Sequence, residues 1–470
     1  MRNFPKFIFS LNFLYITLIA AQVAAIIFLC FYIPSFLPMA AAFALIWLLS
    51  AISAAVLFLK KSAAEIKCAW FVLIAAIPVA GALIYLFASV RKKPCGILKV
   101  NAKKLNGLAG EAQLSCGTCE VGYDGATYFS NGTEFFKRLI SEISRAEKRV
   151  YIEFFIVSRG HIFNAVLSAL EKASKRGAEI KIITDGIGSA FRINRKDLKR
   201  FKALGAEVKV FHKITPLPRA KLNFRDHRKI VAIDGRVAFT GGVNLADEYA
   251  NLTSPYGYWK DNGVALYGAA AKVFEGMFLS VWNGKYEMDA PEGGEHRCLP
   301  YYDSPPHRTF CEDAYINAIS RAESRVHVFT PYLCVSDKTF SAIATAARRG
   351  VDVKIIIPHI PDKKYAFAIS KVYARELTEC GVKVYEFTPG FMHAKCLIAD
   401  DSVFLGSYNL DYRSTHFNFE CGVMLSGTAV DDAERDFANC IALSEPFNAV
   451  KSNAAKKFYG TFLKLLAPLI

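Results

Sequence analysis

Two short patterns in the sequence place a histidine, a lysine and an aspartate at identical spacing. Both read His-x-Lys-x-x-x-x-Asp, and their members are His227, Lys229 and Asp234 in the first copy and His393, Lys395 and Asp400 in the second. In an extended strand, side chains two residues apart share a face, so each histidine should point the same way as its lysine. An imidazole nitrogen can attack phosphorus while a fixed cation stabilises the phosphoryl oxygens. The duplicated pattern therefore predicts phosphodiester chemistry.

Matching flanks indicate that a whole unit is repeated. Ile-Ser-Arg-Ala-Glu occurs at 143–147 and again at 319–323, each time before an apolar run. A helical stretch and a buried-strand run, 180–183 or 353–357, follow in each copy. Strands that alternate with helical stretches predict two α/β units, each with a largely parallel, buried central sheet.

Further polar residues occupy matching places in the two copies. A small-residue turn with an asparagine, Asn244 or Asn409, follows each motif, and Asp261 and Glu420 each begin a later apolar strand. A nucleophilic or acid-base histidine needs an acceptor on its far nitrogen, which fixes the tautomer and stabilises imidazolium. We therefore expect Asp261 and Glu420 to orient the histidines; the alternative is a pair of surface carboxylates.

The duplicated motif resembles the phospholipase D superfamily. With the apolar N-terminal region, three segments are similar to bacterial cardiolipin synthases: Tyr-Phe-Ser-Asn-Gly at 128–132, Gly-Tyr-Trp-Lys-Asp at 257–261 and Asn-Leu-Asp-Tyr-Arg-Ser at 409–414. The similarity covers most of the chain. It implies an α/β fold of two phospholipase D-like α/β/α sandwich repeats, preceded by an N-terminal transmembrane helical region.

The resemblance also implies roles for individual residues. One active site should form between the two halves, with both histidines and both lysines facing it. Asn244 and Asn409 match family positions that donate hydrogen bonds to phosphate, whereas the two motif aspartates are more structural than chemical. The N-terminal histidine is often the nucleophile in the family. We therefore assign attack to His227 and acid-base work to His393, although the near symmetry of the motifs leaves the reverse assignment open.

The implied reaction is transfer of a phosphatidyl group from one phosphatidylglycerol to another, giving cardiolipin and glycerol through a covalent phosphatidyl-histidine. With water as acceptor the same chemistry would make a phospholipase D-type hydrolase, and with another alcohol a different transphosphatidylase. A membrane-bound scaffold with an idle site is the non-enzymatic alternative, which the intact double motif argues against. Two histidines divide the exchange into two steps, so no metal or cofactor is expected.

Three uncharged apolar stretches precede the repeats, at 11–33, 36–59 and 69–90. Each is near the length that crosses a bilayer, and a signal peptide would be shorter and single. Basic residues flank the third stretch on both sides, so it either spans or re-enters near Pro78 and Gly81.

We expect five regions: a membrane-anchoring region with two or three hydrophobic segments, 1–93; a linker, 94–127; a first phospholipase D-like catalytic repeat, 128–290; a second, 300–450; and a C-terminal apolar tail, 451–470. The tail could lie on a membrane surface or pack in the core.

The formal net charge of +16 predicts an anionic partner. We expect the partners to be the bilayer and an anionic phospholipid, phosphatidylglycerol, rather than nucleic acid, because no aromatic-plus-basic nucleic-acid module is recognisable.

The twelve cysteines are scattered and show no spacing typical of a disulfide framework. The close pair Cys116 and Cys119 could bind zinc or form a disulfide, but free thiols are the simpler interpretation and favour a cytosolic catalytic domain. The expected location is the bacterial cell membrane, multi-pass, and the sequence does not give an oligomeric state.

Overall fold

The computed structural model of the protein describes residues 24, 36–59, 63–88, 95–101, 120–213, 223–305, 310–448 and 454–469. The chain divides into two compact units. The first comprises residues 1–92, 214–223 and 462–470, and the second comprises 93–213 and 224–461. Both motif copies lie in the second unit, which therefore carries the candidate site.

The first unit contains three apolar helices: α3 (Phe36–Leu59), α4 (Ala64–Ala76) and α5 (Pro78–Ala88). The third apolar stretch is divided, because Pro78 cannot donate a backbone hydrogen bond and disfavours helical geometry at Ile77 before it. Among the described residues, none of the helices combines the length and apolar character that a membrane crossing requires. The stretch at 11–33 lies almost entirely outside the described residues, as do Cys116 and Cys119.

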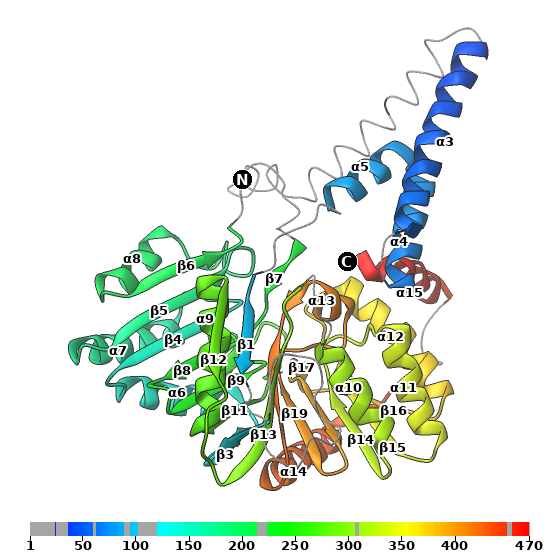
Figure 1. The fold of residues 1–470 in the computed structure, drawn as a ribbon. Helices are drawn as coiled ribbons and strands as arrows, with labels where there is room; N and C mark the ends of the chain where they lie inside the picture. Colours follow the sequence, from blue (N-terminus) through cyan, green and yellow to red (C-terminus); the bar gives the residue numbers. More distant parts are fainter. Residues whose placement is uncertain are drawn as a thin grey trace. The chain divides into compact units, whose positions relative to one another are not determined.

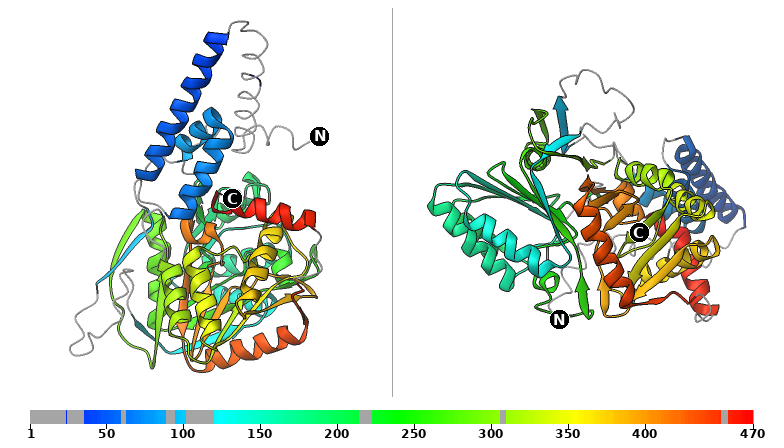
Figure 2. Two further views of the ribbon diagram at one scale, coloured as in Figure 1. Left: turned by 90° about the vertical axis from the view of Figure 1, so that its right-hand side faces the viewer. Right: turned by 90° about the horizontal axis from the view of Figure 1, so that it is seen from below.

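The second unit is built on two mixed sheets with helices on both faces (Figures 1 and 2). Among the described residues the first sheet has seven strands, in the order β3 (Gly125–Phe129), β11 (Gly263–Tyr267), β9 (Val237–Gly241), β8 (Ile230–Ile233), β4 (Arg149–Phe154), β5 (Glu179–Asp185) and β6 (Glu207–Phe211). Its helices are α6 (Gly132–Ser144), α7 (His161–Lys175), α8 (Arg195–Ala203) and α9 (Ala269–Asn283). Apolar side chains of α6 and α7 pack in one core, and those of α9 pack in another.

The second sheet repeats this plan. Its nine described strands run in the order β2 (Val121–Tyr123), β13 (His296–Tyr302), β21 (Cys421–Leu425), β19 (Ser402–Gly406), β18 (Cys396–Ala399), β14 (Arg325–Phe329), β15 (Asp352–Pro358), β16 (Lys383–Phe387) and β22 (Ser444–Pro446). Its helices are α10 (Phe310–Arg321), α11 (Asp337–Arg348), α12 (Lys364–Glu379) and α14 (Thr428–Ala442). The α9 core also holds residues of β18, β19, β21 and α14, so the two repeats share it.

The segment expected to be a linker contains β2 and also β1 (Ile97–Asn101), which pairs in parallel with β12 (Lys285–Asp289). The expectation of largely parallel sheets was wrong. Only β4, β5 and β6 in the first sheet, and β14, β15 and β16 in the second, pair in parallel. The reason is the connection that follows each motif: β8 and β9 are joined by a tight turn, as are β18 and β19, and such turns permit only antiparallel pairing.

Two short parallel ribbons join the repeats. One pairs β7 (Arg225–Asp226) with β20 (Asn418–Phe419), and the other pairs β10 (Tyr258–Lys260) with β17 (Gly390–Met392). Each ribbon takes one strand from each repeat and ends immediately before a histidine of a motif. The remaining described elements are η2 (Asp247–Ala250), α13 (Tyr412–His416), α15 (Ala454–Leu466) and η4 (Ala467–Leu469).

Candidate active site

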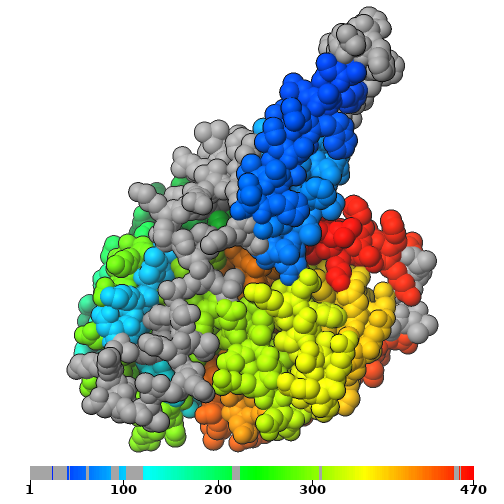
Figure 3. All heavy atoms as spheres, turned by 45° about the vertical axis from the view of Figure 1, so that its right-hand side comes forward, coloured from blue at the N-terminus to red at the C-terminus, as the bar shows by residue number. Residues whose placement is uncertain are grey.

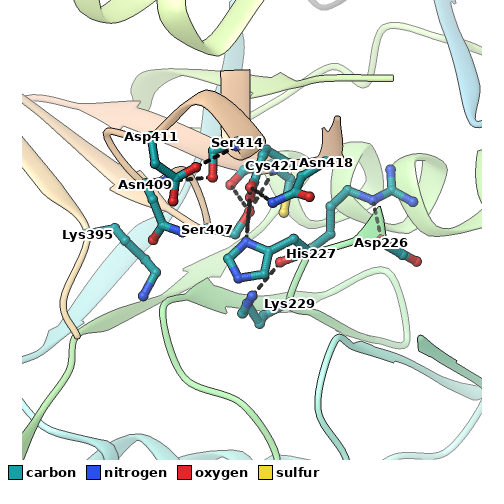
Figure 4. A network of polar contacts seen from close by, with 12 residues as sticks. Asp226, His227, Lys229, Lys395, Ser407, Asn409, Asp411, Ser414, Asn418 and Cys421 are labelled. Carbon is teal, nitrogen blue, oxygen red and sulfur yellow. Dashed lines mark hydrogen bonds and ion pairs between the residues drawn. The ribbon is translucent and has the colours of Figure 1, made fainter. Parts of the chain in front are cut away.

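The first ribbon places His227 beside a carboxylate of the other repeat. The register pairs Phe419 with Asp226, and the His227 N–H donates to the carbonyl of Phe419 at 3.0 Å. Glu420 follows directly, and both of its carboxylate oxygens lie 3.0 Å from His227 Nδ1. Figure 4 shows His227 with its neighbours Ser407 and Asn418. Glu420 is fully buried and His227 is buried.

The second ribbon repeats this arrangement with the roles of the repeats exchanged. The His393 N–H donates to the carbonyl of Lys260 at 2.7 Å, which brings the next residue, Asp261, to the imidazole. Asp261 Oδ2 lies 2.6 Å from His393 Nδ1. Each carboxylate therefore holds the histidine of the other repeat. A histidine that donates its Nδ1–H in this way leaves the lone pair on Nε2 for chemistry.

Both motif lysines are buried beside the histidines. Lys229 Nζ donates to the carbonyl of His227, and Lys395 Nζ donates to that of His393 and lies 3.2 Å from His393 Nε2. Burial lowers the pKa of Lys229 to about 8 and that of Lys395 to about 7. A bound phosphodiester anion would favour the charged form of both amines. The pair can therefore supply cationic charge where phosphoryl oxygens would lie.

The two imidazoles have unequal surroundings. Burial lowers the pKa of both, to about 3 for His393, which is also next to Lys395. The His393 ring is packed against Tyr249 and Trp259, each with its ring centre 5.2 Å away. Although burial acts to raise the pKa of Asp261, the neighbouring His393 and Lys395 hold that pKa below its ordinary value. The surroundings thus lower the pKa of both imidazoles and of both partner carboxylates, Glu420 through its neighbours His227 and Lys229.

The motif aspartates make backbone contacts. Asp234 and Asp400 lie in turns with positive φ, 55° and 47°. Each accepts three backbone N–H groups: Asp234 those of Glu147, Lys148 and Arg149, and Asp400 those of Glu323, Ser324 and Arg325. These bonds tie the turn after each motif to the start of β4 or β14, and they hold the motif strand in its sheet.

The two asparagines differ in what they contact. Asn244 Oδ1 accepts the N–H of Ile156 at 3.0 Å, and its Nδ2 donates to the Tyr249 hydroxyl at 2.7 Å. Asn409 Oδ1 is buried and has no hydrogen-bond partner among the described residues. Figure 4 shows its side chain on the same side of the His227 ring as Lys395. Asn409 Oδ1 is therefore an unused acceptor, which could bind a hydroxyl of a substrate but not a phosphate oxygen, since that oxygen is also an acceptor.

This difference separates two variants. Asn409→Ala should lower kcat/KM by roughly 10- to 100-fold with little change in thermal unfolding, because a polar group beside His227 and Lys395 is lost while no described hydrogen bond of its side-chain oxygen is broken. Asn244→Ala should instead reduce the free energy of unfolding by about 1–3 kcal/mol, since it leaves buried groups of Ile156 and Tyr249 unpaired. Steady-state kinetics and thermal unfolding of both variants measure these effects. Equal kinetic losses at equal stability would contradict the difference.

Several supporting residues were not predicted. Ser407 and Gly242 occupy the same place in the two turns. The Ser407 hydroxyl donates to Glu420, whereas a Cβ at Gly242 would lie 2.0 Å from Asp261 Oδ1. Asn418 Nδ2 also donates to Glu420, at 3.2 Å. The aligned Gly-Gly and Gly-Ser turns were visible in the sequence, but their contact with the carboxylates follows only from the fold.

Buried ion pairs lie beside both motifs, but different residues form them. The fully buried Arg228 donates to Glu153 Oε1 at 2.6 Å and lies 3.5 Å from Asp226. At the corresponding places of the second repeat the sequence has Ala394, Phe329 and Met392, all buried. The charged pair beside the second motif is instead Lys260 and Asp436, 2.7 Å apart, with Lys260 Nζ 5.5 Å from the Phe329 ring centre. No group of three or more potential metal ligands occurs among the described residues.

Comparison with known proteins identifies the family. The family model described as "Cardiolipin synthase, PLD-like domain" matches residues 139–282 and 315–441, which include both motifs. An uncharacterised protein of Streptococcus mutans is 40% identical over 361 residues, covering 73% of this chain and 78% of that protein. A cardiolipin synthase of Clostridium perfringens is 31% identical over 372 residues, covering 73% of this chain and 76% of the relative.

A solved structure, the phosphatidylserine synthase of Haemophilus influenzae, matches with a TM-score of 0.60 at 12% identity, covering 75% of this chain and 97% of that one. This likeness concerns the fold alone, and the phospholipase D-like character of the two repeats comes from the family model. The family model and the relatives show that the chain belongs to the phospholipase D-like cardiolipin synthase family of phosphatidyltransferases.

Proposed function

We propose that the protein is a cardiolipin synthase that transfers a phosphatidyl group from one phosphatidylglycerol to a second, releasing glycerol. The observation that carries this proposal is the pair of crossed histidine–carboxylate contacts in one buried site with two lysines. Such a site holds a nucleophile, an acid-base group and cationic charge for a phosphodiester. The relatives named cardiolipin synthase support the choice of substrate.

In the first half-reaction the nucleophilic imidazole Nε2 attacks phosphorus, and the bond from phosphorus to the headgroup glycerol oxygen breaks. The other histidine, protonated at Nε2, gives its proton to that oxygen, and glycerol leaves. In the second half-reaction the now neutral histidine takes the proton from a hydroxyl of the second phosphatidylglycerol. The resulting oxygen attacks phosphorus, the P–N bond breaks, and cardiolipin is released with both histidines restored.

The surroundings favour His393 as the nucleophile, which reverses the assignment made from the sequence. A nucleophile must be neutral; the His393 ring packs against Tyr249 and Trp259 and has a pKa of about 3, whereas the His227 ring packs against Phe155. His227 is next to Glu420, which Ser407 and Asn418 hold in place, so His227 is the better site for a proton when an anionic lipid binds.

The acceptor distinguishes synthesis from hydrolysis. Purified chain in detergent with phosphatidylglycerol should release glycerol in step with cardiolipin, because a buried site presents the second lipid's hydroxyl better than solvent. Lipid products resolved by mass spectrometry and glycerol measured enzymatically test this expectation. Phosphatidic acid as the main product would make the protein a phospholipase D-type hydrolase. A different phosphatidyl ester formed with an added alcohol would make it another transphosphatidylase.

We further propose that the first unit keeps the enzyme at the bacterial cell membrane. The uncharged helix α3 exposes large apolar side chains, of which Trp47 is 58% and Leu59 is 85% exposed. Lipid is a suitable environment for such a surface. A cytoplasmic position for the catalytic unit is supported by its cysteines, since all eight of those in its described residues are free.

A further inference from the structure

The C-terminal helix α15 presents an apolar face to its surroundings. Phe458, Tyr459, Phe462 and Leu465 are 75%, 52%, 51% and 55% exposed. Their spacing places them on one side of the helix, because positions separated by three, four and seven residues share a face. Large side chains of this kind are seldom grouped on a surface without a partner.

The side of α15 that carries Gly460 is fixed against the catalytic unit. Gly460 is buried, and a Cβ there would lie 2.9 Å from both the carbonyl oxygen of Ala368 and Cγ2 of Val372, in α12. Only a residue without a side chain permits this approach. This contact turns Phe458, on the opposite side of the helix from Gly460, away from α12, and Figure 3 shows the helix at the surface in red.

Charge indicates which partner this face takes. The sequence of α15 contains three lysines and no acidic residue, in a chain with a net charge of +16. Helices with one apolar face and flanking lysines lie in the headgroup region of membranes that contain acidic lipids. Tyr459 suits that position as well, since its ring is apolar and its hydroxyl is polar.

We propose that α15 is a membrane-contact helix that lies in the headgroup region of an anionic phospholipid bilayer, with Phe458, Phe462 and Leu465 inserted. This inference rests on the proposed function, which makes an anionic phospholipid the substrate. The helix would hold the catalytic unit against the surface from which that lipid is drawn.

Photo-crosslinking tests this contact directly in the full chain. p-Benzoylphenylalanine introduced at Phe458 or Phe462 replaces one aromatic side chain by another, and the same probe at Leu443, which is 54% exposed outside α15, serves as a matched control. The chain is reconstituted in vesicles of phosphatidylglycerol and phosphatidylcholine, irradiated and analysed by mass spectrometry. We expect lipid adducts at Phe458 and Phe462 and at least about tenfold fewer at Leu443. Adducts to another peptide of this chain or to a second copy, no adducts, or equal lipid labelling at Leu443 would overturn the proposal.

A second measurement separates this inference from the proposed function. Phe458→Ser combined with Phe462→Ser should lower cardiolipin formation on vesicles about tenfold. In detergent, where the enzyme need not bind a bilayer, the rate should stay within about twofold of that of the unaltered chain. An equal loss in both media would overturn the membrane role. Lipid adducts in a chain that makes no cardiolipin would contradict the proposed function alone, because the adducts do not require turnover.

Discussion

His227→Ala and His393→Ala should each reduce turnover by at least about four orders of magnitude. The two imidazoles act as one unit, so losing either removes both half-reactions, and the double variant should be little worse than each single one. Cardiolipin formation from phosphatidylglycerol measures the loss. His359→Ala is the matched control, because His359 is half-exposed and pairs with Glu386 outside the site; it should keep full activity.

The same variants identify the nucleophile. With His393 as the nucleophile, His227→Ala should accumulate a phosphatidyl adduct on His393 when the substrate has a leaving group that needs no proton, such as p-nitrophenol. His393→Ala should give none, and the adduct is found by peptide mass spectrometry. An adduct on His227 in the His393 variant would restore the assignment made from the sequence. Turnover close to normal without either histidine would refute the mechanism.

Asp261→Asn and Glu420→Gln should each lower kcat by roughly one to a few orders of magnitude while folding is little changed. Each substitution keeps the size of the side chain and removes the negative charge that stabilises imidazolium on the other repeat. The loss should be larger for Asp261→Asn, because Asp261 makes the shorter contact, 2.6 Å, with the proposed nucleophile. Glu420 is additionally held by Ser407 and Asn418, which a glutamine can still engage.

Both carboxylates act through a histidine, so the pH profile is the informative readout. Removing the charge should shift the profile of kcat/KM toward lower pH, because the paired imidazole becomes harder to protonate. Glu434→Gln is the matched control, since Glu434 contacts His327 Nδ1 at 2.9 Å in the same repeat but outside the site. Silent Asp261 and Glu420 variants beside inactive histidine variants would remove the carboxylates from the mechanism.

The sequence was sufficient for the repeated fold and for the residues that meet in the site. Spacing identified the His-x-Lys pairs, and alignment of the two copies identified Asp261 and Glu420. Alignment within one chain, however, cannot say whether a carboxylate contacts the histidine of its own copy or of the other. That outcome depends on the ribbons β7–β20 and β10–β17, which are two and three residues long and carry no periodic signal.

Other features depended on context that a motif does not contain. Asn244 and Asn409 occupy equivalent places in the two motifs. The side chain of Asn244 is hydrogen-bonded to Tyr249 and Ile156, whereas Asn409 Oδ1 has no hydrogen-bond partner among the described residues. The sequence predicted parallel sheets because it contains continuous apolar runs, but buried strands of either direction have such runs. The short turn at Asp234 permits only antiparallel pairing of β8 with β9, and a continuous apolar run does not distinguish the two strand directions.

The exchange of carboxylates between the repeats means that neither repeat is an enzyme by itself. A rigid-body shift that separates the two repeats would break both histidine–carboxylate contacts at once. Activity should therefore require the two repeats to be in contact. Two separately expressed fragments, divided in the connection between β12 and β13, should each be inactive and should regain activity only as they associate. The dependence of that recovered activity on fragment concentration would give the strength of the interface between the halves.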